Sequence, residues 1–167
     1  MTNDELYALW APWRCGYILG PKPAACVFCE KAQAPAAHDR ENLVLERAVH
    51  NFVLMNTYPY NAGHLLVTPY QHSATLEALA PAALHEMMDL LVRWKQRLER
   101  GMRAQGVNIG INLGAVAGAG ITEHVHAHIV PRWQGDTNFM STTADTRVIS
   151  QALHELYETL IMTQEPQ

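Results

Sequence analysis

The stretch His124-Val125-His126-Ala127-His128-Ile129-Val130 places three histidines at every second position of an otherwise apolar run. Successive side chains of a β-strand point to opposite faces, so residues two apart lie roughly 6.6 Å apart on one face. The alternation therefore predicts a strand that presents a row of three imidazoles, with Val125, Ala127 and Ile129 packed behind them.

Three neighbouring imidazoles, each able to titrate near neutral pH, indicate a functional use for the row. Metal binding and nucleophilic or acid–base work on an anionic substrate are the chemistries that need such an arrangement. The alternative is a solvent-facing strand that happens to be rich in histidine. The strict alternation, followed directly by Pro131-Arg132-Trp133, argues against this alternative.

Working outward from this strand, the hydrophobic pattern predicts four more strands and two long helices. The further strands are expected at residues 43–46, 51–56, 64–68 and 107–113. Apolar residues recur at three- and four-residue spacing over about 81–104 and 148–161, which predicts helices there. Pro81 suits the first turn of the long helix, and Gly106 suits the position after its end. Ser73 or Thr75 is a candidate cap for a short helix that precedes the long one. The predicted fold class is α+β, with an antiparallel sheet of about five strands and helices mainly on one face.

Residues 1–25 contain two tryptophans and three prolines, and we expect an extended N-terminal arm that packs on the domain or on a second subunit. Residues 26–167 are expected to form one domain, with a loop over about 30–40. A polar segment over 134–145 is expected either to close over the site or to build an oligomer interface.

The composition limits the class of protein. A chain of 167 residues with 49% hydrophobic residues fits one globular domain. The net charge is −4 and no long basic run exists, so the pattern of a non-specific nucleic-acid binder is missing. No apolar stretch suits a membrane span or a signal peptide, and three cysteines do not make a disulfide framework. We therefore expect a cytoplasmic protein without a nucleic-acid or membrane partner.

Cys26 and Cys29 form a C-x-x-C pair, which supplies half of the four ligands that zinc needs. His72, which follows the third predicted strand, and His124 are candidates for the other two ligands. The alternative is a pair of buried or redox-silent thiols. A thioredoxin-like redox role is disfavoured because no βαβ pattern surrounds the pair.

The glycine-rich loop Gly114–Gly120 precedes the histidine row, and backbone amides in such a loop can approach phosphate oxygens closely. The loop therefore predicts a phosphate site, against the alternative of a simple connection between strands. His64 either reaches the same cavity or is a satisfied core histidine. Asn56 and Asn112 either hydrogen-bond a sugar or phosphate or serve at the surface or in turns.

The histidine stretch matches the H-φ-H-φ-H-φ-φ signature, where φ is apolar, so the chain resembles the histidine triad (HIT) superfamily. Further motifs in family order extend this resemblance over most of the chain. They are Cys26-x-x-Cys29, the stretch from Asn56 to His72, the stretch from Asn108 to Gly114, and Pro131-Arg132. Residues 9–14 and 131–140 are similar to the bacterial branch of diadenosine tetraphosphate phosphorylase- and hydrolase-like proteins.

The resemblance implies a HIT-like α+β fold that commonly forms a homodimer with a shared sheet, with a tetramer as the alternative. It also implies a nucleotidyltransferase or hydrolase in which Nε2 of His126 attacks an α-phosphorus to form a nucleotidyl-histidine. A backbone carbonyl of the glycine loop is expected to set the tautomer of this imidazole. His128 and the loop amides are expected to hold the non-bridging oxygens, and Thr122 lies near the leaving group.

The same resemblance assigns the remaining residues. Residues with catalytic roles are expected to be His124, His126 and His128. Substrate contacts are expected from Asn56, His64, Asn112, Gly118, Gly120, Thr122 and His128. A structural zinc ion is expected at Cys26, Cys29, His72 and His124, with no organic cofactor. Without zinc, His124 would instead support His126.

The expected substrate is a purine nucleotide or a dinucleoside polyphosphate such as diadenosine tetraphosphate, cleaved at the α-phosphate. A nucleoside phosphoramidate hydrolase is the alternative enzyme. Asn56, where many relatives carry an acidic residue, mildly disfavours it. A nucleotide-binding regulatory protein with little turnover and a zinc-stabilised module that binds a protein partner through its arm are the non-enzymatic alternatives.

Overall fold

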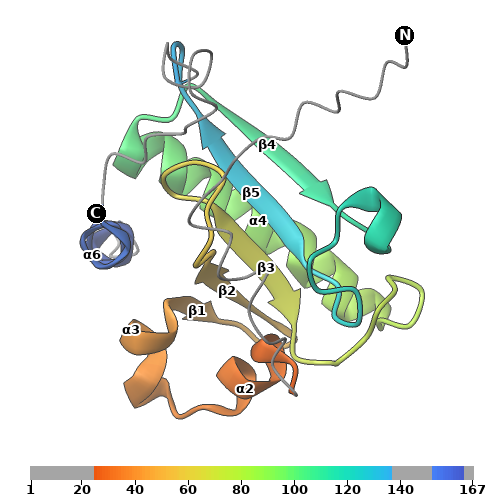
Figure 1. The fold of residues 1–167 in the computed structure, drawn as a ribbon. Helices are drawn as coiled ribbons and strands as arrows, with labels where there is room; N and C mark the ends of the chain where they lie inside the picture. Colours follow the sequence, from red (N-terminus) through yellow and green to blue (C-terminus); the bar gives the residue numbers. More distant parts are fainter. Residues whose placement is uncertain (1–24, 137–151, 164–167) are drawn as a thin grey trace, which may run out of the picture.

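The computed structural model describes residues 25–136 and 152–163 (Figure 1). The predicted arm up to residue 24, the polar segment beyond residue 136 and the start of the C-terminal helix lie outside the described residues.

The predicted α+β class is confirmed, because the strands form one antiparallel sheet in the order β1-β2-β3-β5-β4. The strands are β1 Val44–Arg47, β2 Asn51–Met55, β3 Leu65–Pro69, β4 Gly106–Ile111 and β5 Ala127–Arg132. The helices are α2 Val27–Gln33, α3 Asp39–Asn42, α4 Pro81–Met102 and α6 Leu153–Met162, with 3-10 turns η1 Ala36–His38 and η2 Ala115–Ala117.

The long helix α4 lies across one face of the sheet, and α6 packs beside it (Figure 1). Leu90, Trp94 and Leu98 recur at four-residue spacing and are fully buried against the sheet. Pro81 is the first residue of the helix, as predicted. The helix ends at Met102, because Arg103 adopts the left-handed conformation that was predicted for Gly106. Gly106 instead begins β4, so the predicted end of the helix was wrong by two residues.

The opposite face of the sheet carries a smaller apolar cluster. Phe28 of α2 packs there against buried side chains of β1, β2 and β3, which are Val44, Phe52, Leu54 and Leu66. In each strand these residues alternate with residues of the α4-side core, as the strand period requires. The sheet therefore separates two apolar clusters, and α2 covers the second one.

Three local predictions differ from the structure. Residues 30–40 were expected to be a loop, but they lie in α2, η1 and the start of α3, whose alanines and long polar residues favour helix. The histidine strand was expected from residue 124, but β5 begins at Ala127. A short helix capped by Ser73 or Thr75 was also expected. Instead, the Ser73 hydroxyl closes a turn with the backbone of Thr75.

Among the described residues, none of the helices combines the length and the apolar character that crossing a membrane would require.

Candidate active site and metal centre

The segment that carries His124 and His126 is held by the chain that follows β3. The Val125 amide donates to the Ser73 carbonyl at 2.6 Å, and the Val125 carbonyl accepts from the Thr68 hydroxyl at 3.1 Å. These bonds replace ladder bonds to a neighbouring strand, which explains why β5 begins only after the second histidine. The alternation of faces is still present, because Val125 belongs to the α4-side core while His124 contacts α2.

The His126 imidazole is buried, with 5% of its surface exposed, and three neighbours hold it. Its Nδ1–H donates to the His124 carbonyl at 2.8 Å. Its ring centroid lies 5.0 Å from that of Phe28 and 4.9 Å from that of His128. The prediction that a glycine-loop carbonyl sets the tautomer was therefore wrong, because the preceding histidine supplies the acceptor. A neutral ring bonded in this way carries its lone pair on Nε2.

Burial lowers the pKa of His126 because desolvation disfavours the imidazolium, and the bond to the His124 carbonyl offsets only part of this effect. A lowered pKa keeps the imidazole neutral at pH 7. The local geometry and electrostatics thus both favour a basic, nucleophilic Nε2.

His64 and His128 form a second hydrogen-bonded pair. Nδ1 of His64 accepts from the Tyr60 amide at 3.0 Å, so Nε2 of His64 carries the proton. That Nε2–H donates to Nδ1 of His128 at 2.9 Å, which in turn places the proton of neutral His128 on Nε2. The Tyr60 ring stacks on both, with centroids 4.7 Å from His64 and 5.9 Å from His128. His128 therefore has the opposite tautomer from His126. Its Nε2 is a hydrogen-bond donor, whereas Nε2 of His126 is an acceptor.

Asn56 follows β2 and joins this pair. Its Nδ2 lies 3.3 Å from Nδ1 of His64, and its Oδ1 accepts from the Tyr58 amide at 2.9 Å. The structure therefore brings together four of the predicted residues, Asn56, His64, His126 and His128. Both oxygen and nitrogen of the Asn56 amide already have partners within the protein.

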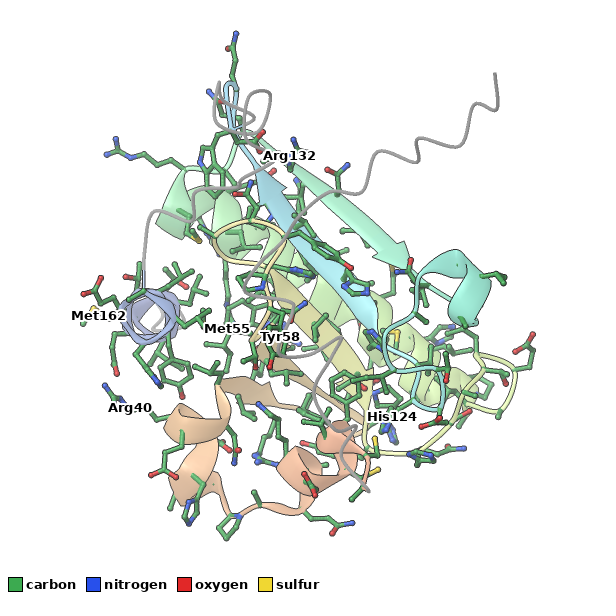
Figure 2. The ribbon with its side chains drawn as sticks, in the orientation of Figure 1. Arg40, Met55, Tyr58, His124, Arg132 and Met162 are labelled. Carbon is green, nitrogen blue, oxygen red and sulfur yellow. The ribbon has the colours of Figure 1, made fainter. Side chains whose placement is uncertain are left out.

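The two thiols and two further imidazoles meet at the start of α2. Sγ of Cys26 lies 3.3 Å from Nδ1 of His124, and Sγ of Cys29 lies 3.6 Å from the same atom and 3.3 Å from Nδ1 of His72. All four ligand atoms lie within 4.8 Å of one another. Figure 2 shows His124 close to α2.

This cluster fits a tetrahedral metal ion. With zinc–sulfur and zinc–nitrogen distances of about 2.3 and 2.05 Å, the edge of a tetrahedron between sulfur and nitrogen is about 3.6 Å. The three sulfur–nitrogen distances of the cluster, 3.3, 3.3 and 3.6 Å, come close to this value. Nε2–H of His124 donates to the Pro69 carbonyl at 2.9 Å, which turns the lone pair of Nδ1 toward the thiols. Burial and the neighbouring Cys26 thiol raise the pKa of Cys29, so a cation here would displace a thiol proton.

The other predicted substrate residues lie between β4 and His124 in the chain. They are Asn112, Gly118, Gly120 and Thr122. The Gly118 amide donates to the Ala115 carbonyl at 3.0 Å within η2, and this loop bond uses a donor that was expected to face phosphate. A Cβ on Gly118 would lie 3.7 Å from Nδ2 of Asn112, so these two residues are neighbours. Thr122 lies with its hydroxyl 3.4 Å from the Glu123 carboxylate, and Gly120 is exposed. Gly118 and Thr122 therefore contact residues of the same segment, Asn112, Ala115 and Glu123.

Two aromatic residues lie against the imidazoles, and neither was predicted from the sequence to belong to the site. Phe28 contacts His124 and His126, and Tyr60 contacts His64 and His128. Phe28 stands inside the C-x-x-C motif and Tyr60 four residues before a histidine. These positions were the only sequence signal available for either residue.

A family model described as the HIT domain matches residues 39–135, which is more than half of the chain. The chain belongs to the HIT family. AP-4-A phosphorylase of Mycobacterium tuberculosis is 35% identical over 92% of this chain and 82% of its own length. The asymmetrical bis(5'-nucleosyl)-tetraphosphatase of Schizosaccharomyces pombe is 33% identical over 56% of this chain and 50% of its own length.

A zinc-bound histidine triad family protein from Mycobacterium smegmatis has a similar structure. Its TM-score is 0.66 at 26% identity, with 83% of this chain and 92% of that chain covered. The HIT-like fold is thus confirmed, and the named relatives confirm the expectation of a HIT-family nucleotide-processing enzyme. The four ligand atoms of the Cys₂His₂ group in this chain lie close enough together that they could hold one metal ion.

Proposed function

We propose that this HIT-family protein cleaves dinucleoside polyphosphates, such as diadenosine tetraphosphate, at an α-phosphate through a nucleotidyl-histidine intermediate. The observation that carries the proposal is the buried His126, whose Nδ1–H is bonded to the His124 carbonyl. This bond directs the lone pair of the neutral ring to Nε2, the atom that would attack phosphorus. The names of two relatives, a phosphorylase and a tetraphosphatase for such dinucleotides, support the substrate class.

In the first step, the Nε2 lone pair of His126 forms a bond to the α-phosphorus, and the bridging oxygen leaves with its electron pair on the remaining polyphosphate. In the second step, an oxygen of water or inorganic phosphate forms a bond to the same phosphorus, the electron pair of the N–P bond returns to Nε2, and the proton of an attacking water is released to solvent. Two displacements replace one more difficult displacement. For diadenosine tetraphosphate, the products are ATP and either AMP or ADP.

The His64–His128 pair fits the second requirement of the reaction, which is stabilisation of negative charge. Its tautomers place a proton on Nε2 of His128, next to the ring of His126. We assign this N–H to a phosphate oxygen that gains charge as phosphorus is attacked. Asn112, Gly118, Gly120 and Thr122 remain proposed substrate contacts, and Asn56 a proposed contact of the ribose.

For the metal centre we propose zinc, held by Cys26, Cys29, His72 and His124. A bound zinc ion would supply a structural link between α2, the chain after β3 and the segment that carries the triad. Thiolate and imidazole ligands at these distances favour zinc over magnesium or calcium, which prefer oxygen ligands.

We further propose a homodimer, with a tetramer as the alternative assembly. β4 is an edge strand of the sheet, and an unpaired edge favours association with another strand. Ile109 on β4 and Met88 and Val92 on α4 are large apolar side chains that are exposed on the single chain. Sedimentation equilibrium of the wild-type protein and of an Ile109→Lys variant tests this assembly, which predicts a smaller species for the variant.

The function is tested by incubating the purified full-length chain with diadenosine tetraphosphate, with and without inorganic phosphate, and separating the products. ADP formed together with ATP only in the presence of phosphate would establish phosphorolysis. AMP and ATP formed regardless of phosphate would establish hydrolysis. Trapping of labelled nucleotide on the wild-type protein, but not on His126→Ala, tests the covalent intermediate.

Two outcomes would contradict the proposal. Full turnover by His126→Ala would exclude the nucleotidyl-histidine route. Nucleotide binding without any product would exclude this substrate class and direct attention to phosphoramidates, other nucleotide conjugates or a regulatory binding role.

A further inference from the structure

Phe28 lies between the thiol cluster and the candidate nucleophile. It is the third residue of the C-x-x-C motif and is 2% exposed. Its ring centroid lies 5.2 Å from that of His124, in an edge arrangement, and 5.0 Å from that of His126. One aromatic ring thus contacts both a metal-ligand candidate and the imidazole that is proposed to attack phosphorus.

The helix that carries Phe28 is fastened at its far end by an arginine of β1. Arg47 donates to the carbonyls of Lys31, Ala32 and Ala34 at 2.9 to 3.1 Å and forms an ion pair with Asp39. These contacts satisfy the carbonyls at the C-terminal end of α2.

The near end of α2 is different. Its first turn is connected to the triad segment through Cys26 and Cys29, which face Nδ1 of His124. Cys26 precedes the helix and provides no side-chain cap for its amides. The sheet-side cluster holds one part of Phe28, and the orientation of its ring toward the imidazoles depends in addition on how firmly the two thiols are held.

We propose that Phe28 is a positioning residue, which transmits the order of the metal centre to the His126 imidazole. The proposal rests on the proposed attack by His126. A metal ion bound to both thiols and to His124 would fix the first turn of α2, and the Phe28 ring would then hold the His126 imidazole, which His128 also contacts. Because attack requires an aligned lone pair, a small rotation of the ring is expected to slow the reaction strongly.

A second path runs in parallel through the backbone. His124 supplies both a candidate ligand atom, Nδ1, and the carbonyl that accepts the His126 proton. Metal binding would thus orient both the acceptor and the Phe28 ring. The variant Phe28→Leu removes the ring path and leaves the backbone path in place, which allows the two to be separated.

The experiment compares Phe28→Leu with a matched control, Phe52→Leu. Phe52 is fully buried in the same apolar cluster, but its recorded ring contact is with Tyr70. Both variants lose a buried ring of the same size, so a general loss of packing affects them equally. Phe28→Tyr keeps the ring and serves as the conservative rescue.

Two quantities are measured at one fixed pH, with the chelator-treated protein and after addition of Zn²⁺ alone. The first is the kcat and KM for diadenosine tetraphosphate. The second is the tautomer of His126 and the line width of its signals, from ¹H–¹⁵N correlation spectra of the imidazoles, because the tautomer reports the backbone path and the line width reports the order of the ring. Zinc is expected to raise kcat of the wild type, Phe28→Tyr and Phe52→Leu by about tenfold with little change in KM, and that of Phe28→Leu by about twofold at most. The spectra should show the proton on Nδ1 of His126 in every variant, because the His124 carbonyl is unchanged, and broadened His126 signals only in Phe28→Leu.

The inference is overturned if Phe28→Leu responds to zinc as Phe52→Leu does, or if its KM alone rises. It is also overturned if the His126 signals of Phe28→Leu are as narrow as those of the wild type. Should Phe28→Leu not fold, Phe28→Met replaces it. If no variant cleaves the dinucleotide, the proposed function fails, while the imidazole spectra still decide the role of Phe28.

Discussion

The two faces of the sheet differ in what covers them and in what they carry. Within residues 25–136 and 152–163, twenty buried apolar side chains form one cluster on the α4 side, whereas five form the cluster on the α2 side. The α2 side also carries imidazoles and thiols, and His126 is packed against Phe28. The difference indicates that the first face provides most of the folding free energy, since that energy grows with buried apolar area. The second face can then hold polar groups whose orientation matters more than their contribution to stability.

The largest effect is expected from His126→Gln, which probes the α2 face. The variant keeps a polar side chain but lacks the imidazole lone pair, so turnover of diadenosine tetraphosphate should fall on the order of 10⁴-fold or more. Thermal unfolding by circular dichroism should change little, since the apolar clusters remain intact. A large loss of stability with activity per folded molecule retained would invert the comparison between the faces.

The next effect is expected from Leu98→Ala on the α4 face. Leu98 is fully buried in the larger cluster, and its truncation should lower the free energy of unfolding by about 2–5 kcal/mol. The kcat per folded molecule should stay within about twofold, because no residue of the site is altered. Gln96→Ala on the exposed side of the same helix is the control and should change the free energy of unfolding by less than about 0.5 kcal/mol in urea denaturation.

A smaller effect is expected from loss of the metal centre. Zinc at a hundredfold excess over its dissociation constant should stabilise the wild type by about 2.7 kcal/mol. Cys29→Ser removes one of the four ligand candidates, so the rise in melting temperature with zinc should largely vanish. Cys15→Ser, which changes the third cysteine, should respond like the wild type. An equal response of both variants would show that the Cys₂His₂ cluster is not the zinc site.

The smallest effect concerns Glu86, which links α4 to the turn before β2. Its carboxylate accepts from the amides of Val49, His50 and Asn51 and from the Asn51 side chain. Partial burial alone would raise the pKa of Glu86, but these hydrogen bonds outweigh it and lower the pKa below its usual value.

A lowered folded-state pKa means that the ionised carboxylate stabilises the folded chain above the unfolded pKa. This stabilisation is lost as the pH falls through the lower, folded-state pKa. Glu86→Gln should therefore be less stable than the wild type by about 1 kcal/mol at pH 7, and the two should converge near pH 3. Urea denaturation at both pH values measures this, and a constant difference across that range would contradict the assignment.

The strands, the long helix and the imidazole-rich site could be predicted from the sequence, because each follows from a periodic pattern of apolar and polar residues within one segment. The hairpin of β1 and β2 and the helix from Pro81 follow from patterns within single segments. The helices between Cys29 and Asn42 were missed, because short helices depend on contacts such as those of Arg47 with three carbonyls. The start of β5 was misplaced because Val125 bonds to the chain after β3. The homodimer, the zinc ion and the roles of the site residues remain predictions.

The sequence by itself determined which side chains share a face, since a period of two residues assigns Val125, Ala127 and Ile129 to one side and the histidines to the other. It also determined the family, through the histidine signature and the motifs that accompany it. The tertiary structure alone decided the hydrogen-bond acceptor of His126, the tautomers of His64 and His128, and the place of Phe28 against two imidazoles. The reason is physical. Tautomers and ring contacts depend on atoms that lie within a few ångströms in space, and sheet order and helix packing bring these atoms together from segments up to 98 residues apart.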